Sequence, residues 1–499
     1  MILAAFLLAI VTVPVLQPTP QPRPPQLAFV HHTVTTDSAA AQALFDRGLT
    51  LYYAYNGGQA VLLFEQAHKT DPKLAMSYWG EALGYGPDIN TTLDERHFNL
   101  AHRAIEQAAA LEGSASIEER AYIDAMRKRY SGPWHRHNQA EAAYQDAMAA
   151  LVKIYPNDDD AKVLYAEALL EKQGDDKLWK PDGLPSTNDT KIIVDLLDSV
   201  LGHDPQNIMA NHLTIHVFDY STDQRRALPS ADRLAADRFE PAAEHLRHMP
   251  AHTYIETGEY ANAIAGSKNA IALFHRFLAS PDAYREHAGY LDHDIDIGFR
   301  AAMMGDDYAT ALDLAKQFDD RAGGDSAQFA AMRRFYRWTD IAGAAHENSI
   351  PEHHARMAAA VAAGNLTGVA TEIRALQKLK TQPTDDCSAR IALLKNQPKE
   401  ALAHALAAVK SQDAQFGEYV PNFPALETLG AVYYRTGSFE LAESTFEKTL
   451  QRYPNDARAE FGLWQTLTKL GKAAPAAQAQ SRFNALWRNS STEFSMNDL

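Results

Sequence analysis

Two pairs of histidines stand four residues apart, at the spacing of one helical turn. The stretch NHLTIH holds His212 and His216, and the stretch HLRHMPAH holds His248 and His252. Residues four apart in a helix lie on one face, so each pair can present two imidazoles to a single first-row metal ion. The spacing therefore predicts a metal site built from these histidines.

The second pair is interrupted by Pro250, and proline is favoured at the first position of a helix. We therefore expect a helix to begin there, with His252 in its first turn and His248 on a preceding, non-helical residue. His252 follows His216 by 36 residues, and His293 lies about one further period along. Helices one repeat apart are neighbours in a solenoid, so the five histidines should converge on its concave surface, where one ion could be shared.

Other polar and aromatic residues are candidates for supporting this site. Asp219, one turn beyond His216, would orient an imidazole by accepting its second N–H, or it would simply end the helix. Trp79 and Asn90, in SYWGEALGYGPDIN, would line a pocket beneath the histidines or form a packed turn. The remaining candidates for the surroundings of the metal are His245, Tyr254 and Asp296.

The donor types limit the chemistry of the site. Imidazoles and carboxylates without thiolate admit Cu(II), Zn(II) or Fe(II), and the single cysteine, Cys387, rules out a thiolate cluster. The sequence contains no glycine-rich phosphate loop, so no nucleotide cofactor is expected. It also contains no serine nucleophile elbow. The alternative is that the histidines are polar groups of a groove that bind no metal.

The bulk composition excludes some classes of partner. The chain has 499 residues, and its net charge of −16 argues against binding nucleic acid or an anionic membrane surface. Residues 1–16, MILAAFLLAIVTVPVL, form an apolar run that suits a signal peptide or an N-terminal membrane tether. A proline-rich spacer follows over residues 17–34. We therefore expect an exported protein, periplasmic or secreted, with membrane contact only through an uncleaved leader.

Two stretches carry the signature of a 34-residue tetratricopeptide repeat (TPR), a pair of packed helices. In residues 41–74, Gly48 stands against Ala60 and Phe64 fills the gap to the next unit. Residues 423–456 repeat this register with Gly430 and Phe446. Small residues allow the two helices of a unit to approach closely.

The remaining segments between these repeats also have helical periodicity, and most of their units are degenerate. The sequence predicts an all-α fold: a TPR-like solenoid of helical hairpins, coiled as a right-handed superhelix, over residues 35–490. The histidine-rich centre spans 205–300, and residues 491–499 form a polar tail. Two insertions, 172–189 and 225–250, are expected to form walls or a lid around the centre.

The chain resembles a mostly bacterial group of TPR proteins. The residues that carry the resemblance include FDRGLTLYYAYN, ANHLTIHVFDYS, HLRHMPAHTYIETGEY and NDARAEFGLWQTL. The resemblance implies histidines at the positions of His212, His216, His248 and His252, and it implies no settled substrate. This chain has Asn56-Gly57 where its relatives have Asn-His, and Asp296 where they often have a second histidine.

Two functions follow from these observations. The first is a scaffold that binds a protein or peptide in its concave groove, as TPR units commonly do, with the histidines holding a metal or serving as polar contacts. The second is a metal-dependent enzyme that uses the histidine cluster, with a coordination position open to water or substrate. The sequence leaves open whether the protein is an enzyme.

Overall fold

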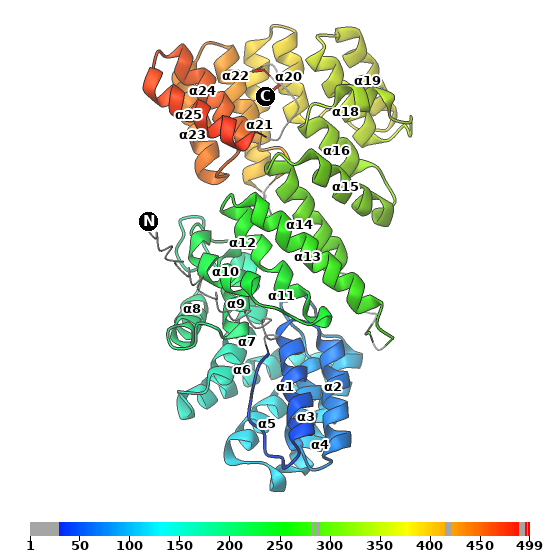
Figure 1. Ribbon diagram of the computed structural model, residues 1–499, viewed down its shortest axis with the longest axis vertical. Helices are drawn as coiled ribbons and strands as arrows, with labels where there is room; N and C mark the ends of the chain where they lie inside the picture. The colour runs from blue at the N-terminus through cyan, green and yellow to red at the C-terminus, as the bar shows by residue number, and fades with distance from the viewer. Residues whose placement is uncertain (1–28, 282, 285–289, 415–420, 489–494, 497) are drawn as a thin grey trace, which may run out of the picture.

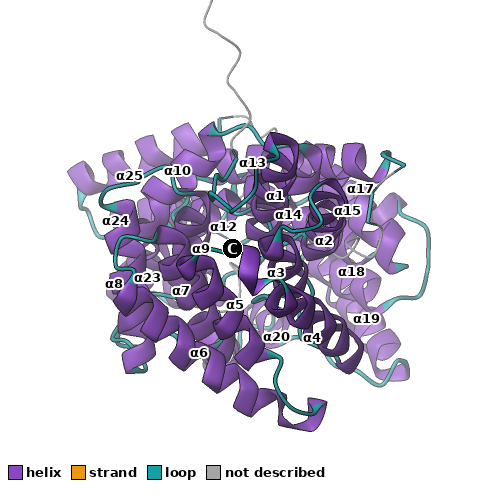
Figure 2. Ribbon diagram, turned by 90° about the horizontal axis from the view of Figure 1, so that it is seen from below, coloured by secondary structure: helices purple, strands orange, loops and turns teal. Residues whose placement is uncertain are grey.

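The computed structural model describes residues 29–281, 283–284, 290–414, 421–488, 495–496 and 498–499. This part of the chain consists of helices and connecting loops and contains no β-strand, as Figure 2 shows. Successive helices pack on one another along the chain, so the protein is a TPR-like helical solenoid (Figure 1). The expected all-α class is confirmed. The expected leader, residues 1–16, lies outside the described residues, as does most of the polar tail.

The N-terminal half of the array is built from hairpins whose ends are fixed by local hydrogen bonds. Ser116 and Glu119 cap the start of one helix reciprocally, each side chain bonding the other's backbone N–H. The helices of this half are α1 (Ala39–Tyr53), α2 (Gly57–Thr70), α3 (Ala75–Gly84), α4 (Glu95–Ala110), α5 (Ile117–Arg129), α6 (His137–Ile154), α7 (Asp159–Gln173) and α8 (Asn188–Leu201).

The centre of the array combines three helices of nine residues or fewer with three longer ones. They are α9 (Ile208–Asp219), α10 (Leu228–Ala236), α11 (His245–His248), α12 (Pro250–Glu256), α13 (Tyr260–Leu278) and α14 (Tyr290–Met304). Pro250 occupies the first position of α12, as predicted. The expectation of a non-helical His248 is wrong, because that residue ends the one-turn helix α11.

The C-terminal half returns to regular hairpins. Its helices are α15 (Tyr308–Ala322), α16 (Ser326–Arg334), α17 (Trp338–Gly343), α18 (Ile350–Ala362), α19 (Leu366–Lys378), α20 (Asp385–Leu394), α21 (Pro398–Asp413), α22 (Ala425–Arg435), α23 (Phe439–Arg452), α24 (Ala457–Lys469) and α25 (Ala473–Leu486).

The two predicted repeats have the close packing that their small residues require. A Cβ atom on Gly48 or Gly80 would lie 2.7 or 2.5 Å from the buried ring of Phe64, so both helices that flank α2 touch that ring through a glycine. Phe446 on α23 has the same relation to Gly430 on α22, where a Cβ would lie 2.6 Å from the ring. In the hairpins at both ends of the array, a phenylalanine ring therefore packs directly on a glycine of the neighbouring helix.

The array also makes contacts between units far apart in sequence. The turn after α12 meets the turn between α23 and α24: the Tyr260 hydroxyl donates to the carbonyl of Pro454 at 2.8 Å. The Asn455 amide donates to the carbonyl of Gly258 at 3.0 Å. Gly258 has a φ of +79°, and a Cβ there would clash with Pro454, so this contact requires glycine.

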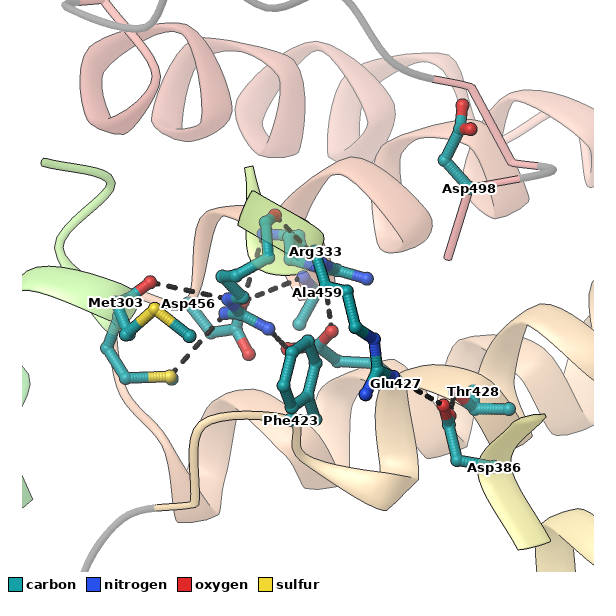
Figure 3. A network of polar contacts seen from close by, with 12 residues as sticks. Met303, Arg333, Asp386, Phe423, Glu427, Thr428, Asp456, Ala459 and Asp498 are labelled. Carbon is teal, nitrogen blue, oxygen red and sulfur yellow. Dashed lines mark hydrogen bonds and ion pairs between the residues drawn. The ribbon is translucent and has the colours of Figure 1, made fainter. Parts of the chain in front are cut away.

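A buried ionic network lies in the C-terminal half (Figure 3). Glu427 on α22 accepts from Arg334 of α16 at 2.7 Å, and its other oxygen lies 2.7 Å from Nε of Arg458 on α24. All three side chains are at most 2% exposed. Burial by itself would raise the pKa of Glu427, but the two guanidinium groups hold that pKa below its ordinary value. The network ties α16 to helices about a hundred residues later.

The described part of the N-terminal segment packs onto the first helices. His32 lies 2.7 Å from the carboxylate of Asp160 on α7, and the backbone N–H of Val30 donates to Thr50 on α1. Val34 is buried. The end of the segment expected to be a spacer is therefore part of the folded domain. Among the described residues, none of the helices has the length and apolar character needed to cross a bilayer.

Candidate metal centre

Six histidines gather where α9, α11, α12 and α14 meet, and they form two groups of three. In each group, one nitrogen from every ring lies within 4.8 Å of the other two. We name His248, His252 and His293 the cavity triad, and His212, His216 and His245 the inner triad. Five of the six side chains are buried, and His293 is partly exposed.

The rings of the cavity triad point Nε2 atoms at one another. The Nε2 atoms of His248 and His252 lie 2.8 Å apart, and those of His252 and His293 lie 3.1 Å apart. Two imidazole nitrogens bound to one tetrahedral ion at 2.0–2.1 Å would be separated by about 3.3 Å. The ring nitrogens of this triad therefore stand close to the spacing that a shared ion would impose.

Carboxylates lie behind two rings of the cavity triad. Nδ1 of His252 donates to Asp219 at 3.1 Å, and Nδ1 of His248 lies 2.9 Å from a carboxylate oxygen of Asp294. A carboxylate beside Nδ1 favours the proton on that nitrogen, which leaves a lone pair on Nε2. The facing Nε2 atoms are then both acceptors, so their lone pairs repel each other. A cation between them would bind both lone pairs and remove this repulsion.

The inner triad follows the same pattern with different partners. Nδ1 of His212 donates to the backbone carbonyl of Tyr53 at 2.8 Å, and Nδ1 of His216 lies 3.5 Å from a carboxylate oxygen of Asp175. The two Nε2 atoms face each other at 3.2 Å. The ring of His245 completes the group, with its centroid 5.1 Å from that of His212.

Burial sets the protonation of most of these rings. It lowers the pKa of His212, His245 and His248 well below the ordinary value, and the neighbouring imidazoles lower it further. Burial also lowers the pKa of His252, but nearby carboxylates, Asp219 foremost, together raise that pKa overall. Neutral imidazole is the form that binds metals, so His212, His245 and His248 are prepared to accept a cation, and a protonated His252 would release its proton on binding one.

A cavity of about 560 Å³ reaches the cavity triad at His293. Its walls come from the start of α2, the loop after α3 and the start of α14. They are mostly polar or aromatic and include Tyr55, Asp88, Asn90 and Tyr290. Burial raises the pKa of Asp88 to about 6, although hydrogen bonds from Asn90 and Thr91 oppose that rise.

Tyr55 connects this cavity to the inner triad. It has a φ of +54°, a conformation that is strained for a tyrosine, in the turn between α1 and α2. Its ring centroid lies 4.4 Å from that of His212 and 5.5 Å from that of His245. The next residue, Asn56, anchors the turn by donating to the carbonyl of Ala242 at 2.9 Å. The strained turn therefore fixes one wall of the histidine cluster.

The structure divides the predicted ligands differently from the sequence. The five predicted rings do assemble, but His212 and His216 group with His245, while His248 and His252 group with His293. His245 was expected only to support or pack against the ligands, yet it takes a position equivalent to theirs.

The residues expected around the ligands have mixed outcomes. Asp219 orients His252 rather than the neighbouring His216, and Asn90 lines the cavity as predicted. Two assignments are wrong: Asp296 pairs with Arg300 at 2.8 Å, and the Tyr254 hydroxyl donates to Asp232. Trp79 takes the packed alternative, against Phe45 and Tyr122 in the N-terminal core.

Three residues of the site were not predicted as part of it: Tyr55, Asp175 and Tyr290. Asp175 lies in the 172–189 insertion, which was expected to form a wall or lid. The sequence therefore indicated this segment but not the residue. Trp179 of the same insertion donates to the carbonyl of Val217 on α9 at 2.6 Å. The 225–250 insertion forms α10 and also supplies His245 and His248. Both insertions therefore enclose the centre.

Solved structures that resemble the chain include a TPR domain. The P58(IPK) TPR domain is 14% identical, with 87% of this chain and 99% of that chain covered, at a TM-score of 0.23. A human IFIT1 dimer with m7Gppp-AAAA is 14% identical over 92% of this chain and 91% of that one, at a TM-score of 0.30. Naa15/Naa10 bound to HypK-THB is 14% identical over 90% and 59%, at 0.22.

Similarities this low carry no argument about ligand or activity. No protein-family model and no curated protein matches the sequence. What the protein does must therefore be argued from its own residues.

Proposed function

We propose that the protein binds a first-row transition metal ion at the cavity triad and acts as a metal-dependent enzyme on a small polar molecule. The observation that carries this proposal is the pair of short Nε2 to Nε2 distances, 2.8 and 3.1 Å, in His248, His252 and His293. Carboxylates behind two of these rings leave their Nε2 lone pairs facing inward. A cation is the ligand that such an arrangement fits.

Three protein donors support catalysis rather than a purely structural role. Catalytic zinc sites commonly have three protein ligands and an open position, whereas structural sites are closed by four. The cavity reaches His293, so an ion held there would face it. Such an ion supplies Lewis-acid or redox chemistry, and a set of imidazoles without thiolate suits Cu, Zn or Fe.

The cavity supports a small, polar substrate. Its volume of about 560 Å³ lies within the range of ordinary small-molecule pockets. Asp88, Asn90 and Thr91 offer hydrogen-bonding groups to a ligand, and Tyr55 and Tyr290 offer aromatic faces. Tyr290 also lies beside His245, with ring centroids 4.7 Å apart, so a bound molecule would lie next to the histidine cluster.

Elemental analysis of purified protein tests the proposal. We expect copurified or reconstituted metal in the wild type and a loss of one ion per chain in His293→Ala. His97→Ala is the matched control, because His97 also lines the cavity but belongs to neither triad. Failure of Cu, Zn and Fe(II) to bind the wild type stoichiometrically or to shift its unfolding temperature would overturn the proposal.

A peptide-binding scaffold remains the second candidate, and exposed apolar side chains in the C-terminal units favour it. Ile350, Leu366, Leu406 and Leu441 are 40–51% exposed on α18, α19, α21 and α23. A protein partner that copurifies with the wild type should be lost from Leu366→Asp/Leu441→Asp, while metal binding persists. Loss of no partner would remove this candidate.

We also propose export, on the strength of the apolar run at residues 1–16. Amino-terminal sequencing of protein recovered from outside the cytoplasm tests it. A mature chain that begins after this run supports export, and recovery of the whole chain only from the cytoplasm opposes it.

A further inference from the structure

We propose that the inner triad, His212, His216 and His245, binds a second metal ion beside the first, so that the protein holds a pair of ions. This inference rests on the proposed function for the first ion. It requires that the inner triad have its own ligand atoms, and its own hydrogen bonds and packing contacts to hold them in place. Three features of the structure meet that requirement.

The first feature is the isolation of the His245 ring. Its side chain is 1% exposed, and neither ring nitrogen has a hydrogen-bond partner among the described residues. Buried polar groups in folded proteins almost always find a partner, and one left without it destabilises the fold. A bond from one of these nitrogens to a metal ion would remove that penalty.

The second feature is the tautomer of the other two rings. A carbonyl oxygen can only accept, so the contact with Tyr53 places the proton of neutral His212 on Nδ1. Asp175 favours the same tautomer in His216, although at 3.5 Å its contact is longer. The two Nε2 atoms, 3.2 Å apart, are then both acceptors. Their separation matches the value of about 3.3 Å expected for two imidazoles on one tetrahedral ion.

The third feature is the aromatic packing that holds these rings in place. Tyr55 lies against His212 and His245, and Tyr290 lies edge-on to His245, with centroids 4.7 Å apart. These contacts prevent the ring of His245 from turning toward solvent for a hydrogen bond. The ligand atoms of this triad lie within 4.8 Å of one another, and two bonds of 2.0–2.1 Å span at most about 4.2 Å. On a tetrahedral ion the bound nitrogens are about 3.3 Å apart, so the ring of His245 would have to move inward by up to about 1.5 Å.

The two triads adjoin, which makes a pair of ions the natural arrangement. His245 and His248 belong to different triads but to one helical turn, and their stacked ring centroids are 5.9 Å apart. The cavity reaches His293 and no ring of the inner triad. The inner ion would therefore be enclosed by protein, while the outer ion faces the cavity.

The experiment is a count of Cu(II) ions per chain in the full-length protein after loading and removal of excess copper. We expect two ions in the wild type, one in His245→Phe and one in His293→Ala. Phenylalanine keeps an aromatic ring between Tyr55 and Tyr290, so packing is retained while both nitrogens are lost. His97→Ala, on the cavity wall, should keep both ions.

Electron paramagnetic resonance of the same samples gives an independent readout. Two neighbouring Cu(II) ions should broaden or quench each other's signal in the wild type. Each single-site variant should show the resolved spectrum of one isolated Cu(II), with the full intensity of one spin per chain. The ion retained in His245→Phe also reports that the fold is intact, and His216→Gln replaces that variant if it does not fold.

The possible outcomes separate the two proposals. One ion in the wild type, lost in His293→Ala and retained in His245→Phe, overturns the second site and leaves the proposed function standing. Two ions in folded His245→Phe, or none in that variant with its fold intact, also overturn the second site. No ion in the wild type overturns both proposals.

Discussion

Replacing Asp219 by asparagine should weaken metal binding at the cavity triad without removing a ligand. The Asp219 carboxylate is 7% exposed and accepts from Nδ1 of His252 at 3.1 Å. Asparagine keeps an oxygen that can accept the same N–H, so the orientation of the ring is preserved. The substitution therefore removes one negative charge near the ion and little else.

The distance from that charge to the ion sets the magnitude. Adding the 3.1 Å hydrogen bond, the width of the ring and a bond of about 2.0 Å puts a divalent ion roughly 7 Å from the carboxylate. Between effective dielectric constants of about 80 and 20, attraction at that distance is about 1–5 kcal/mol. Outer partners of metal-bound histidines typically contribute about 10–100-fold in affinity, or about 1.4–2.7 kcal/mol, which falls within this range.

Competition with a chromophoric chelator at neutral pH measures the affinity directly. We expect Asp219→Asn to bind the cavity-triad ion about 10–100-fold more weakly, with unchanged stoichiometry. Asp296→Asn is the matched control, since the Asp296 carboxylate pairs with Arg300 rather than with an imidazole of either triad. An affinity of Asp219→Asn within twofold of the wild type, or an equal loss in the control, would refute the reasoning.

The remaining predictions concern stability. Gly462→Ala should destabilise the protein by about 1–3 kcal/mol in chemical denaturation, because its Cβ would overlap the ring of Phe446; Gly324→Ala, where a Cβ meets nothing within 4 Å, should have little effect. Glu427→Ala should cost about 3–5 kcal/mol, because it removes the carboxylate that pairs with two buried guanidinium groups. Glu106→Ala breaks an ion pair whose carboxylate is 45% exposed and should cost under about 1 kcal/mol. Equal losses in a variant and its control would contradict either prediction.

The helical repeats could be predicted because their packing is local. The glycine and phenylalanine of one hairpin are close in sequence: Gly48 and Phe64, which pack together, are 16 residues apart. That spacing is visible in the sequence. The contact of Gly258 with Pro454 has no such signal, because it joins turns from units nearly two hundred residues apart. Only the path of the whole array brings those turns together.

The histidines of the site could be predicted, but their grouping could not. Spacing of four residues reveals a shared helical face, yet the division into triads depends on how the one-turn helix α11 is set against α9 and α14. The same limit explains the error at Asp296. Asp294 and Asp296 are two residues apart and point to nearly opposite sides of α14, and Asp294 is the buried one. Periodicity alone did not show which side faced the imidazoles.

Two hydrogen bonds, from Tyr260 and Asn455, join the turn after α12 to the turn after α23. The array is therefore not an open solenoid in which each unit contacts only its neighbours. Linear repeat proteins often survive the loss of their last units, because each unit touches only its neighbours. Here a chain cut short before α23 would lose both of these bonds, and the segment next to His252 would lose its clamp. The C-terminal units thus stabilise the histidine-rich centre, and removing them should increase the mobility of the imidazole cluster.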